Sequence, residues 1–296
     1  MVERLAGLSV SSAPYGDAGL IRSILGSHFP VADIRLAALR TRGSYSTVSA
    51  SRVTAVSASA YAKFMGISGT LATFDLETTG VDVETSRIVS ACIAFVDPSG
   101  AVVSRWDWLA DPGVEIPAGA AAIHGISTER ARAEGRQAAI VVAEIVQTLK
   151  VTCALGMPLV VYNAPYDLSL LDRECRRHSI NSLVEPYVVI DPLVIDKAVD
   201  RYRRGKRTLE VTAGLYGVSL DDAHDAGSDA IAAARVAHAL VAKYTDELSI
   251  PFAELHDRQR QWYADQAASF QDYMRSSKGD HNFVANSEWP VRSFPQ

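Results

Sequence analysis

The chain has 296 residues, a formal net charge of −5 and 48% hydrophobic residues, so it can bury a substantial core as a globular protein. This charge excludes a global positive field, and a nucleic-acid partner would need a local basic patch or a metal. The three cysteines, Cys92, Cys153 and Cys175, form no C-x-x-C motif, which argues against a zinc site and favours a reducing, cytoplasmic location. No apolar run approaches the ~20 residues of a membrane span, so we expect no membrane partner.

Residues 1–68 differ in composition from the rest of the chain. They are rich in Ser, Ala and Arg and contain only three acidic residues. We treat this segment as an N-terminal appendage of unknown role. A transit peptide, a small accessory module and a weak nucleic-acid-binding arm all have such a composition, which therefore assigns no function to the segment.

From residue 69 onwards, strand patterns come first and then alternate with helical patterns. The first part predicts three strands, over residues 70–76, 87–97 and 102–109, with a turn at 97–100. The second part predicts a helix over 138–149, a strand over 158–162, a helix from 168, a strand over 188–190 and a helix over 225–244. This order predicts one α/β domain over 69–245, a mixed sheet flanked by helices.

Two acidic residues, Asp75 and Glu77, are separated by one residue within the first predicted strand. Because side chains alternate along a strand, both carboxylates point to one face, opposite Phe74 and Leu76. Two partly desolvated carboxylates repel each other, and a hard divalent cation such as Mg²⁺ or Mn²⁺ relieves that repulsion. Alone this pattern is weak evidence for a metal site, because alternating charges are common on the solvent-exposed face of an antiparallel strand.

Later segments supply two further carboxylates and a histidine. Asp167 follows the strand predicted at 158–162, at an edge where open α/β sheets bind ligands. A structural role for Asp167, as the N-cap of the next helix, is an equally good interpretation. His224 and Asp229 are five residues apart, so they converge only if His224 precedes a helix that carries Asp229 in its first turns. Asp225 is a suitable N-cap for such a helix. A lone histidine is more often a surface or core residue than a catalyst.

Three short segments together resemble a known family. FDLETTG at 74–80, NAPYD at 163–167 and HDAGSD at 224–229 resemble the three motifs of the DEDDh 3′→5′ exonucleases. This DnaQ-like family includes the epsilon subunit of bacterial DNA polymerase III and ribonuclease T. The sequence IHGI at 123–126 is similar to the segment between the first two family motifs, and Tyr166 stands where Phe is common in the family.

The resemblance implies an RNase H-like fold and hydrolysis of terminal phosphodiesters that releases nucleoside 5′-monophosphates. It implies that two Mg²⁺ or Mn²⁺ ions are held by four carboxylates, those of Asp75, Glu77, Asp167 and Asp229. It also implies that His224 takes the proton from the attacking water. Residues in or near the motifs are then expected to contact the substrate: Thr78, Thr79, His124, Asn163 and Tyr166.

A basic run precedes the third motif and contains Arg201, Arg203, Arg204, Lys206 and Arg207. We predict that Arg204, Lys206 and Arg207 contact the phosphate backbone of the substrate, because an acidic protein needs local positive charge to accept a polyanion. The alternative is a solvated surface loop, which is the usual role of a charge run.

Residues 246–296 are predicted to form an amphipathic helix followed by an irregular tail. The helix carries a largely aromatic stripe made of Phe252, Leu255, Gln259, Trp262, Tyr263, Phe270 and Tyr273. We expect this stripe to pack on the exonuclease domain, and a dimer or polymerase contact is the alternative. In the tail, Trp289 is a candidate anchor, and the tail aromatics are also candidates for base stacking.

The leading hypothesis is a 3′→5′ exonuclease that acts on the free 3′ end of DNA in proofreading, repair or end trimming. A DNA polymerase subunit is a candidate partner. An exoribonuclease of the same fold is an alternative, because the motifs do not select the sugar. A catalytically idle module that binds a polymerase or nucleic acid is a third hypothesis, and the complete set of acidic residues argues against it. The oligomeric state and the preference for single or double strands stay open.

Overall fold

The structure is a computed structural model that describes residues 69–184, 187–220 and 225–294. The prediction of an N-terminal appendage over residues 1–68 lies outside the described residues. No described helix has the length and apolar character needed to cross a membrane.

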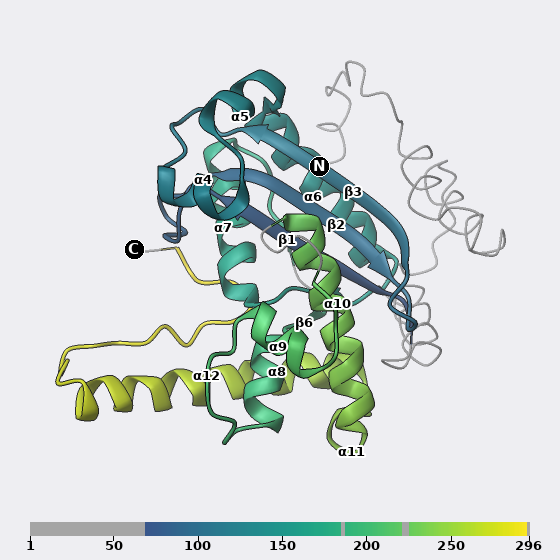
Figure 1. Cartoon of the computed structure of the whole chain (residues 1–296), viewed down its shortest axis with the longest axis vertical. Coiled ribbons are helices and arrows are strands. Elements are labelled where there is room, and N and C mark those ends of the chain that lie inside the picture. Colours follow the sequence, from purple (N-terminus) through teal and green to yellow (C-terminus); the bar gives the residue numbers. More distant parts are fainter. Residues whose placement is uncertain (1–68, 185–186, 221–224, 295–296) are drawn as a thin grey trace, which may run out of the picture. The chain divides into compact units, whose positions relative to one another are not determined.

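A six-stranded sheet in the order β4-β3-β2-β1-β5-β6 lies at the centre of the described chain (Figure 1). Its first three strands form an antiparallel meander of β1 (Leu71–Thr78), β2 (Ile88–Val96) and β3 (Val102–Asp111). These strands match the three predicted from the sequence to within two residues at each end. In β1 the alternating apolar residues Phe74 and Leu76 are buried, and β2 is buried over almost its whole length.

Three short strands complete the sheet with parallel pairing. The strand β5 (Leu159–Val160) pairs with β1, and β6 (Val189–Ile190) pairs with β5. At the other edge, β4 (Arg136–Gln137) pairs with β3. The combination of antiparallel and parallel pairs confirms the predicted mixed sheet.

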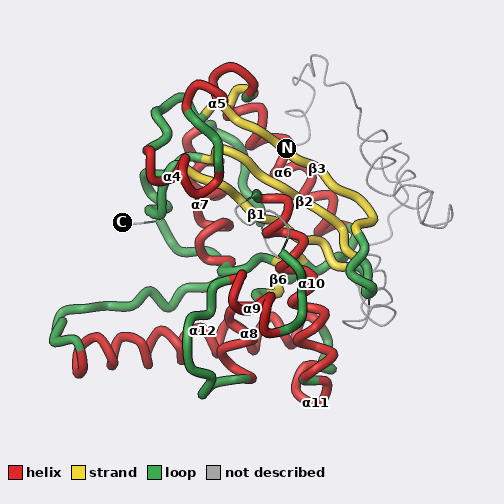
Figure 2. The backbone as a smooth tube through the Cα atoms, in the orientation of Figure 1, coloured by secondary structure: helices red, strands yellow, loops and turns green. Residues whose placement is uncertain are grey.

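Long helices cover both faces of this sheet (Figures 1 and 2). The helices α6 (Ala138–Ala154) and α7 (Ala164–Arg177) lie on one face, and α10 (Ala226–Lys243) lies across β1 and β2 on the other. The helix α10 is rich in buried alanines, which let its backbone approach the sheet closely. The Thr73 hydroxyl of β1 accordingly donates a hydrogen bond to the Ala230 carbonyl at 2.7 Å.

The structure contains short helices that the sequence patterns did not predict. They are α4 (Ala118–His124), α5 (Thr128–Glu134), α8 (Pro192–Val199), α9 (Leu209–Leu215) and α11 (Thr245–Leu248). Each has at most eight residues, too few for a clear 3.6-residue periodicity. The residues before α5, α8 and α9 are Ser127, Asp191 and Thr208, whose side chains accept hydrogen bonds from first-turn N–H groups. These caps are the sequence signal that identifies those helices.

The C-terminal helix α12 spans Phe252–Ser277. Its first turns are anchored by Phe252 and Leu255, which are buried in a core cluster against which Trp262 also packs. Phe270 is 50% exposed and Tyr273 is 46% exposed. The expectation that the aromatic stripe packs on the domain is therefore correct for the first half of α12 and wrong for the second, which extends beyond α8 (Figure 1).

Candidate active site

Asp75 and Glu77 project from the central strand β1 toward α10. Residues directly opposite each other in an antiparallel pair share a face, and Asp75 lies opposite Cys92, which belongs to the cluster that packs on α10. Phe74 and Leu76 point to the other face and are buried. The predicted alternation along this strand is therefore confirmed.

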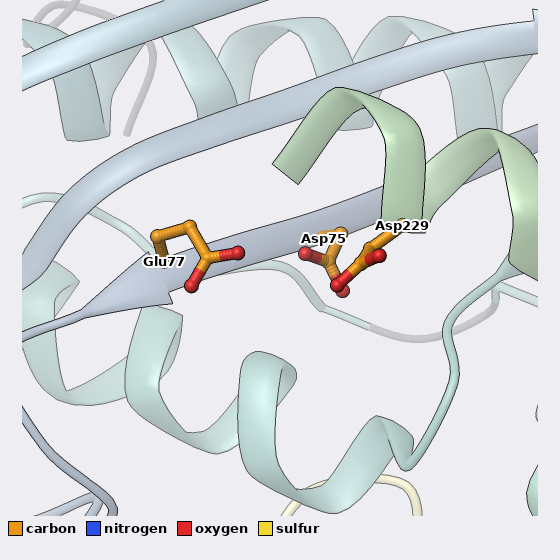
Figure 3. Close-up of side chains that lie close together, drawn as sticks. All are labelled: Asp75, Glu77 and Asp229. Carbon is orange, nitrogen blue, oxygen red and sulfur yellow. The ribbon is translucent and has the colours of Figure 1, made fainter. Parts of the chain in front are cut away.

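The helix α10 brings a third carboxylate, that of Asp229, to this pair. The helix begins directly after Asp225, whose carboxylate accepts a hydrogen bond from the Ser228 N–H at 3.1 Å. The predicted N-cap is thus confirmed, and Asp229 lies in the first turn. Oxygens of Asp75, Glu77 and Asp229 all lie within 4.8 Å of one another. Figure 3 shows the three carboxylates turned toward a common space.

The fourth predicted carboxylate, Asp167, sits in the first turn of α7. It is 4% exposed, and its Oδ1 accepts a hydrogen bond from the Leu76 N–H of β1 at 3.2 Å. The N-cap residue of α7 is Asn163, in a left-handed conformation with φ of 65°, so the N-cap alternative for Asp167 is wrong. Asp167 lines the same cleft as the other three carboxylates but is outside the tight three-residue cluster.

Burial and mutual repulsion strongly perturb these acids. Burial raises the pKa of Asp75 well above its usual range, and the negative charges of neighbouring carboxylates, first Asp167, raise it further. Burial, followed by repulsion from Asp229 and Asp225, raises the pKa of Glu77 to about 8. The described charged residues that act most strongly on these two pKa values are all carboxylates. A set of hard oxygen donors that repel one another fits a divalent cation.

The raised pKa of Glu77 predicts how the stability of the metal-free protein depends on pH. The pKa is about 8 in the folded protein and ordinarily 4.5. Between these values the folded state binds more protons than the unfolded state, so the free energy of unfolding falls as the pH rises. We expect the melting temperature in EDTA to fall from about pH 5 to about pH 8.5, and to fall less steeply in Glu77→Gln. If the melting temperature of the wild type rose over this pH range and that of Glu77→Gln did not, the raised pKa of Glu77 would be contradicted.

The four carboxylates line a cleft of about 760 Å³. Apolar and aromatic residues line it as well, among them Tyr162, Leu193 and Leu209. Lys197 of α8 and Lys206 of the loop before α9 add positive charge to the same cleft. The cleft thus offers acidic groups for cations, ammonium groups for phosphates and apolar surface for a base.

The motif residues Thr78, Thr79 and Tyr166 take part in hydrogen bonds around the turn that follows β1. The Tyr166 and Thr78 hydroxyls lie 2.5 Å apart, and both donate to the Gly80 carbonyl. The Thr79 hydroxyl accepts a hydrogen bond from the Arg87 N–H at 2.9 Å. Tyr166 lines the cleft, whereas Thr78 and Thr79 do not. Burial raises the pKa of Tyr166 to about 12, so its hydroxyl stays protonated.

Other predicted contact residues are spread more widely. Asn163 lines the cleft. His124 ends α4, accepts a hydrogen bond on Nδ1 from the Ile126 N–H at 3.2 Å, and lies outside the cleft lining. Arg204 is exposed and also outside that lining. His224 lies outside the described residues, and its neighbour Asp225 caps the helix that carries Asp229.

Arg207 lines the cleft, but its guanidinium is already bound by the protein. Nη1 lies 2.6 Å from the buried Asp196 carboxylate, and Arg203 pairs with the same carboxylate. The guanidinium of Arg207 also donates to the carbonyls of Asp196, Asp200 and Arg203. These bonds give Arg207 a role in ordering the loop that presents Lys206.

Two residues near the site went unnoticed in the sequence patterns. Lys197 lines the cleft but has no basic residue beside it in the sequence, so no charge run identifies it. Asp191 is fully buried and accepts hydrogen bonds from the Asn163 N–H at 3.0 Å and the Ala164 N–H at 2.9 Å. The sequence signal for Asp191 is an aspartate after a short apolar strand and directly before proline, a typical helix start.

A mixed sheet with carboxylates on its central strand and α10 packed across them defines the RNase H-like exonuclease fold. The sequence model of the exonuclease family matches residues 73–237. The chain belongs to this family, and the predicted DEDDh-type, DnaQ-like relationship is confirmed.

Relatives with solved structures share the fold at low sequence identity. Exonuclease I of Methylocaldum szegediense superposes with a TM-score of 0.54 at 19% identity, over 68% of this chain and 46% of that one. E. coli exonuclease I in complex with a dA16 oligonucleotide gives a TM-score of 0.51 at 22% identity, over 63% and 43% of the two chains.

Among curated relatives, the PolC-type DNA polymerase III of Streptococcus thermophilus is 28% identical over 168 residues. The same enzyme of Streptococcus agalactiae is 26% identical over 168 residues. Each match covers 56% of this chain and 11% of the polymerase. The chain therefore spans about a tenth of the length of these relatives.

Proposed function

We propose that this protein is a divalent-metal-dependent 3′→5′ exonuclease that removes nucleoside 5′-monophosphates from DNA. The observation that carries the proposal is the convergence of Asp75, Glu77 and Asp229 within 4.8 Å, with Asp167 in the same cleft. All four residues lie within residues 73–237, the part of the chain that the exonuclease family model matches. Carboxylate oxygens in this arrangement suit two Mg²⁺ or Mn²⁺ ions.

In this proposal each side chain has a distinct task. Divalent cations bound by the four carboxylates supply electrostatic stabilisation of the scissile phosphate and of the leaving 3′ oxygen. His224 accepts the proton of the attacking water, because a histidine near its ordinary pKa is largely neutral at pH 7 or above. Tyr166, Asn163 and the apolar lining of the cleft hold the terminal nucleotide.

We propose single-stranded DNA as the substrate, and the relatives support this proposal. E. coli exonuclease I was crystallised with a dA16 oligonucleotide, and the curated relatives are DNA polymerases. The two cleft lysines, Lys197 and Lys206, provide the local positive charge that a polyanion needs at a protein of net charge −5.

We also propose residues 69–245 as the catalytic domain, residues 246–296 as a helix and tail, a DNA polymerase as a partner and the cytoplasm as the location.

The cleft lysines lead to a prediction about binding. Lys206→Gln and Lys197→Gln should each weaken the binding of a single-stranded oligonucleotide, because each removes one phosphate contact. The slope of log K against log salt should become shallower by about 0.7 per lysine. Fluorescence anisotropy in EDTA, where no cleavage occurs, measures both effects. Lys278→Gln, at an exposed lysine beyond α12, is the control, and an equal change in all three variants would refute a specific role of the cleft.

The proposed function is tested by incubating the protein with 3′-labelled oligonucleotides. The substrates are single-stranded DNA, a duplex with a 3′ mismatch, and RNA, each with Mg²⁺, Mn²⁺ or EDTA. We expect metal-dependent release of labelled mononucleotides from DNA. Release from RNA alone would favour the exoribonuclease alternative, and absence of release from all three would favour a catalytically idle binding module.

A further inference from the structure

The tail after α12 returns to the body of the protein (Figure 1, yellow). Near the far end of α12, the Phe283 ring packs edge-on against Phe270 with centroids 5.3 Å apart. The Arg275 Nε donates a hydrogen bond to the Phe283 carbonyl at 2.8 Å. Residues 278–294 form neither helix nor strand, so specific side-chain contacts of this kind determine the path of the tail.

The tail contacts α12 and Asp191 through Trp289. This residue is 3% exposed, and the centroid of its indole ring lies 4.8 Å from the centroid of the His256 ring of α12. Its Nε1–H donates a hydrogen bond to the Asp191 Oδ2 at 3.3 Å. An indole N–H at a buried position needs such an acceptor.

Asp191 in turn fixes the start of two helices that face the cleft. Its Oδ1 accepts hydrogen bonds from the Asn163 and Leu193 N–H groups at 3.0 Å each, and its Oδ2 accepts one from the Ala164 N–H at 2.9 Å. Asn163 and Ala164 open α7, and Leu193 lies in the first turn of α8. The Asp191 carboxylate is thus hydrogen-bonded to the start of α7, three to four residues before Asp167, which lies in the first turn of that helix.

A second group of contacts ties the end of the tail to α7. The Ser169 hydroxyl accepts a hydrogen bond from the Arg292 N–H at 2.8 Å. Arg173 donates to the Arg292 carbonyl at 2.9 Å and to the Ser293 carbonyl at 2.8 Å. Ser169 and Arg173 are buried and lie two and six residues after Asp167. The tail thus contacts α7 along its face and, through Asp191, at its start.

We propose that Trp289 is a positioning residue of the nuclease site, which acts through Asp191 to hold the start of α7 and thereby Asp167 beside β1. The inference rests on the proposed function. It assigns a role to a segment that lies beyond residues 73–237, the part matched by the family. Trp289 touches none of the proposed metal ligands, so its removal should alter metal affinity and turnover rather than the capture of the oligonucleotide.

The test compares Trp289→Phe and Trp289→Ala with Phe270→Ala in the full chain. Trp289→Phe keeps an aromatic ring beside His256 and removes the N–H donor, and Phe270→Ala removes an aromatic contact between α12 and the tail that is remote from Asp191. Mn²⁺ binding is measured by calorimetry, and kcat and KM are measured on a single-stranded oligonucleotide. We expect Trp289→Phe to weaken Mn²⁺ binding and lower kcat by roughly tenfold, within the range for groups that orient metal ligands, with KM nearly unchanged. Trp289→Ala should have a larger effect and Phe270→Ala none.

The outcomes separate this inference from the proposed function. If Trp289→Phe melts earlier but binds Mn²⁺ like the wild type, Trp289 has only a structural role and the inference is overturned. If the wild type releases no nucleotides but its Mn²⁺ binding still depends on Trp289 and is lost in Asp75→Asn, the proposed function fails and the positioning role stands. An equal loss of Mn²⁺ affinity in Phe270→Ala would also overturn the inference.

Discussion

Asp75→Asn is expected to lower the rate of nucleotide release by about 10³-fold or more. The metal ions of such a site contribute several kcal/mol of transition-state stabilisation, and each 1.36 kcal/mol corresponds to a factor of ten in rate. Asp75 is the residue whose loss should matter most, because it is surrounded by Asp167, Glu77 and Asp229, the three charges that act most strongly on it after burial. The measurement is a single-turnover assay with excess enzyme on 3′-labelled single-stranded DNA.

The same substitution should make the metal-free protein more stable. Burial and the neighbouring carboxylates both disfavour the charged form of Asp75, and an amide of the same shape removes that cost. We therefore expect Asp75→Asn to raise the melting temperature in EDTA and to abolish the rise that Mn²⁺ produces in the wild type. An inactive variant that melts earlier than the wild type in EDTA would indicate misfolding and would leave the activity loss without the proposed cause.

Asp107→Asn is the matched control for this prediction. Asp107 lies opposite Cys92, which lies opposite Asp75, so both aspartates belong to one row across the sheet. The Asp107 side chain is 52% exposed and pairs with Arg105. We expect Asp107→Asn to keep its nuclease activity and its response to Mn²⁺. Equal losses in Asp75→Asn and Asp107→Asn would show that general acidity of this face, and not a specific site, supports activity.

The parts of the site that could be predicted from the sequence are those governed by local rules. Alternation along β1 placed Asp75 and Glu77 on one face, and the helix start at Asp225 placed Asp229 in the first turn of α10. Both depend on a few consecutive residues, so one sequence suffices to predict them. The encounter of β1 with α10 is a tertiary contact, and it was inferred from the resemblance of the three motifs to a family.

The parts that escaped prediction depend on contacts between distant segments. Nothing in the sequence around Asp191 indicates that its carboxylate accepts a hydrogen bond from the indole N–H of Trp289, 98 positions later in the chain. Arg207 was predicted to bind substrate because it belongs to a basic run, but the buried Asp196 already binds its guanidinium. An isolated lysine such as Lys197 carries no pattern, and only the packing of α8 brings it to the cleft. The basic run therefore contains both Arg207, whose guanidinium is already paired, and Lys206, which lines the cleft.

His224→Ala is expected to slow nucleotide release by about 10²–10⁴-fold, the usual contribution of a general base. Its effect should differ in kind from that of Asp75→Asn, because the four carboxylates that hold the cations remain. Calorimetry should therefore show Mn²⁺ binding close to that of the wild type. The distinction follows from the division of tasks in the proposal, where the carboxylates hold the cations and the imidazole accepts a proton.

The pH profile provides the sharper readout for His224. In the wild type, kcat/KM should fall as the pH drops below about 6.5, because protonation of the imidazole removes the base. In His224→Ala this limb should be lost, and the remaining rate should rise with hydroxide concentration. His281→Ala, at an exposed histidine of the tail, should retain the wild-type profile. If the acid limb persists unchanged in His224→Ala, the group that titrates belongs to the carboxylate cluster, and the proton acceptor must be sought among Asp75, Glu77, Asp167 and Asp229.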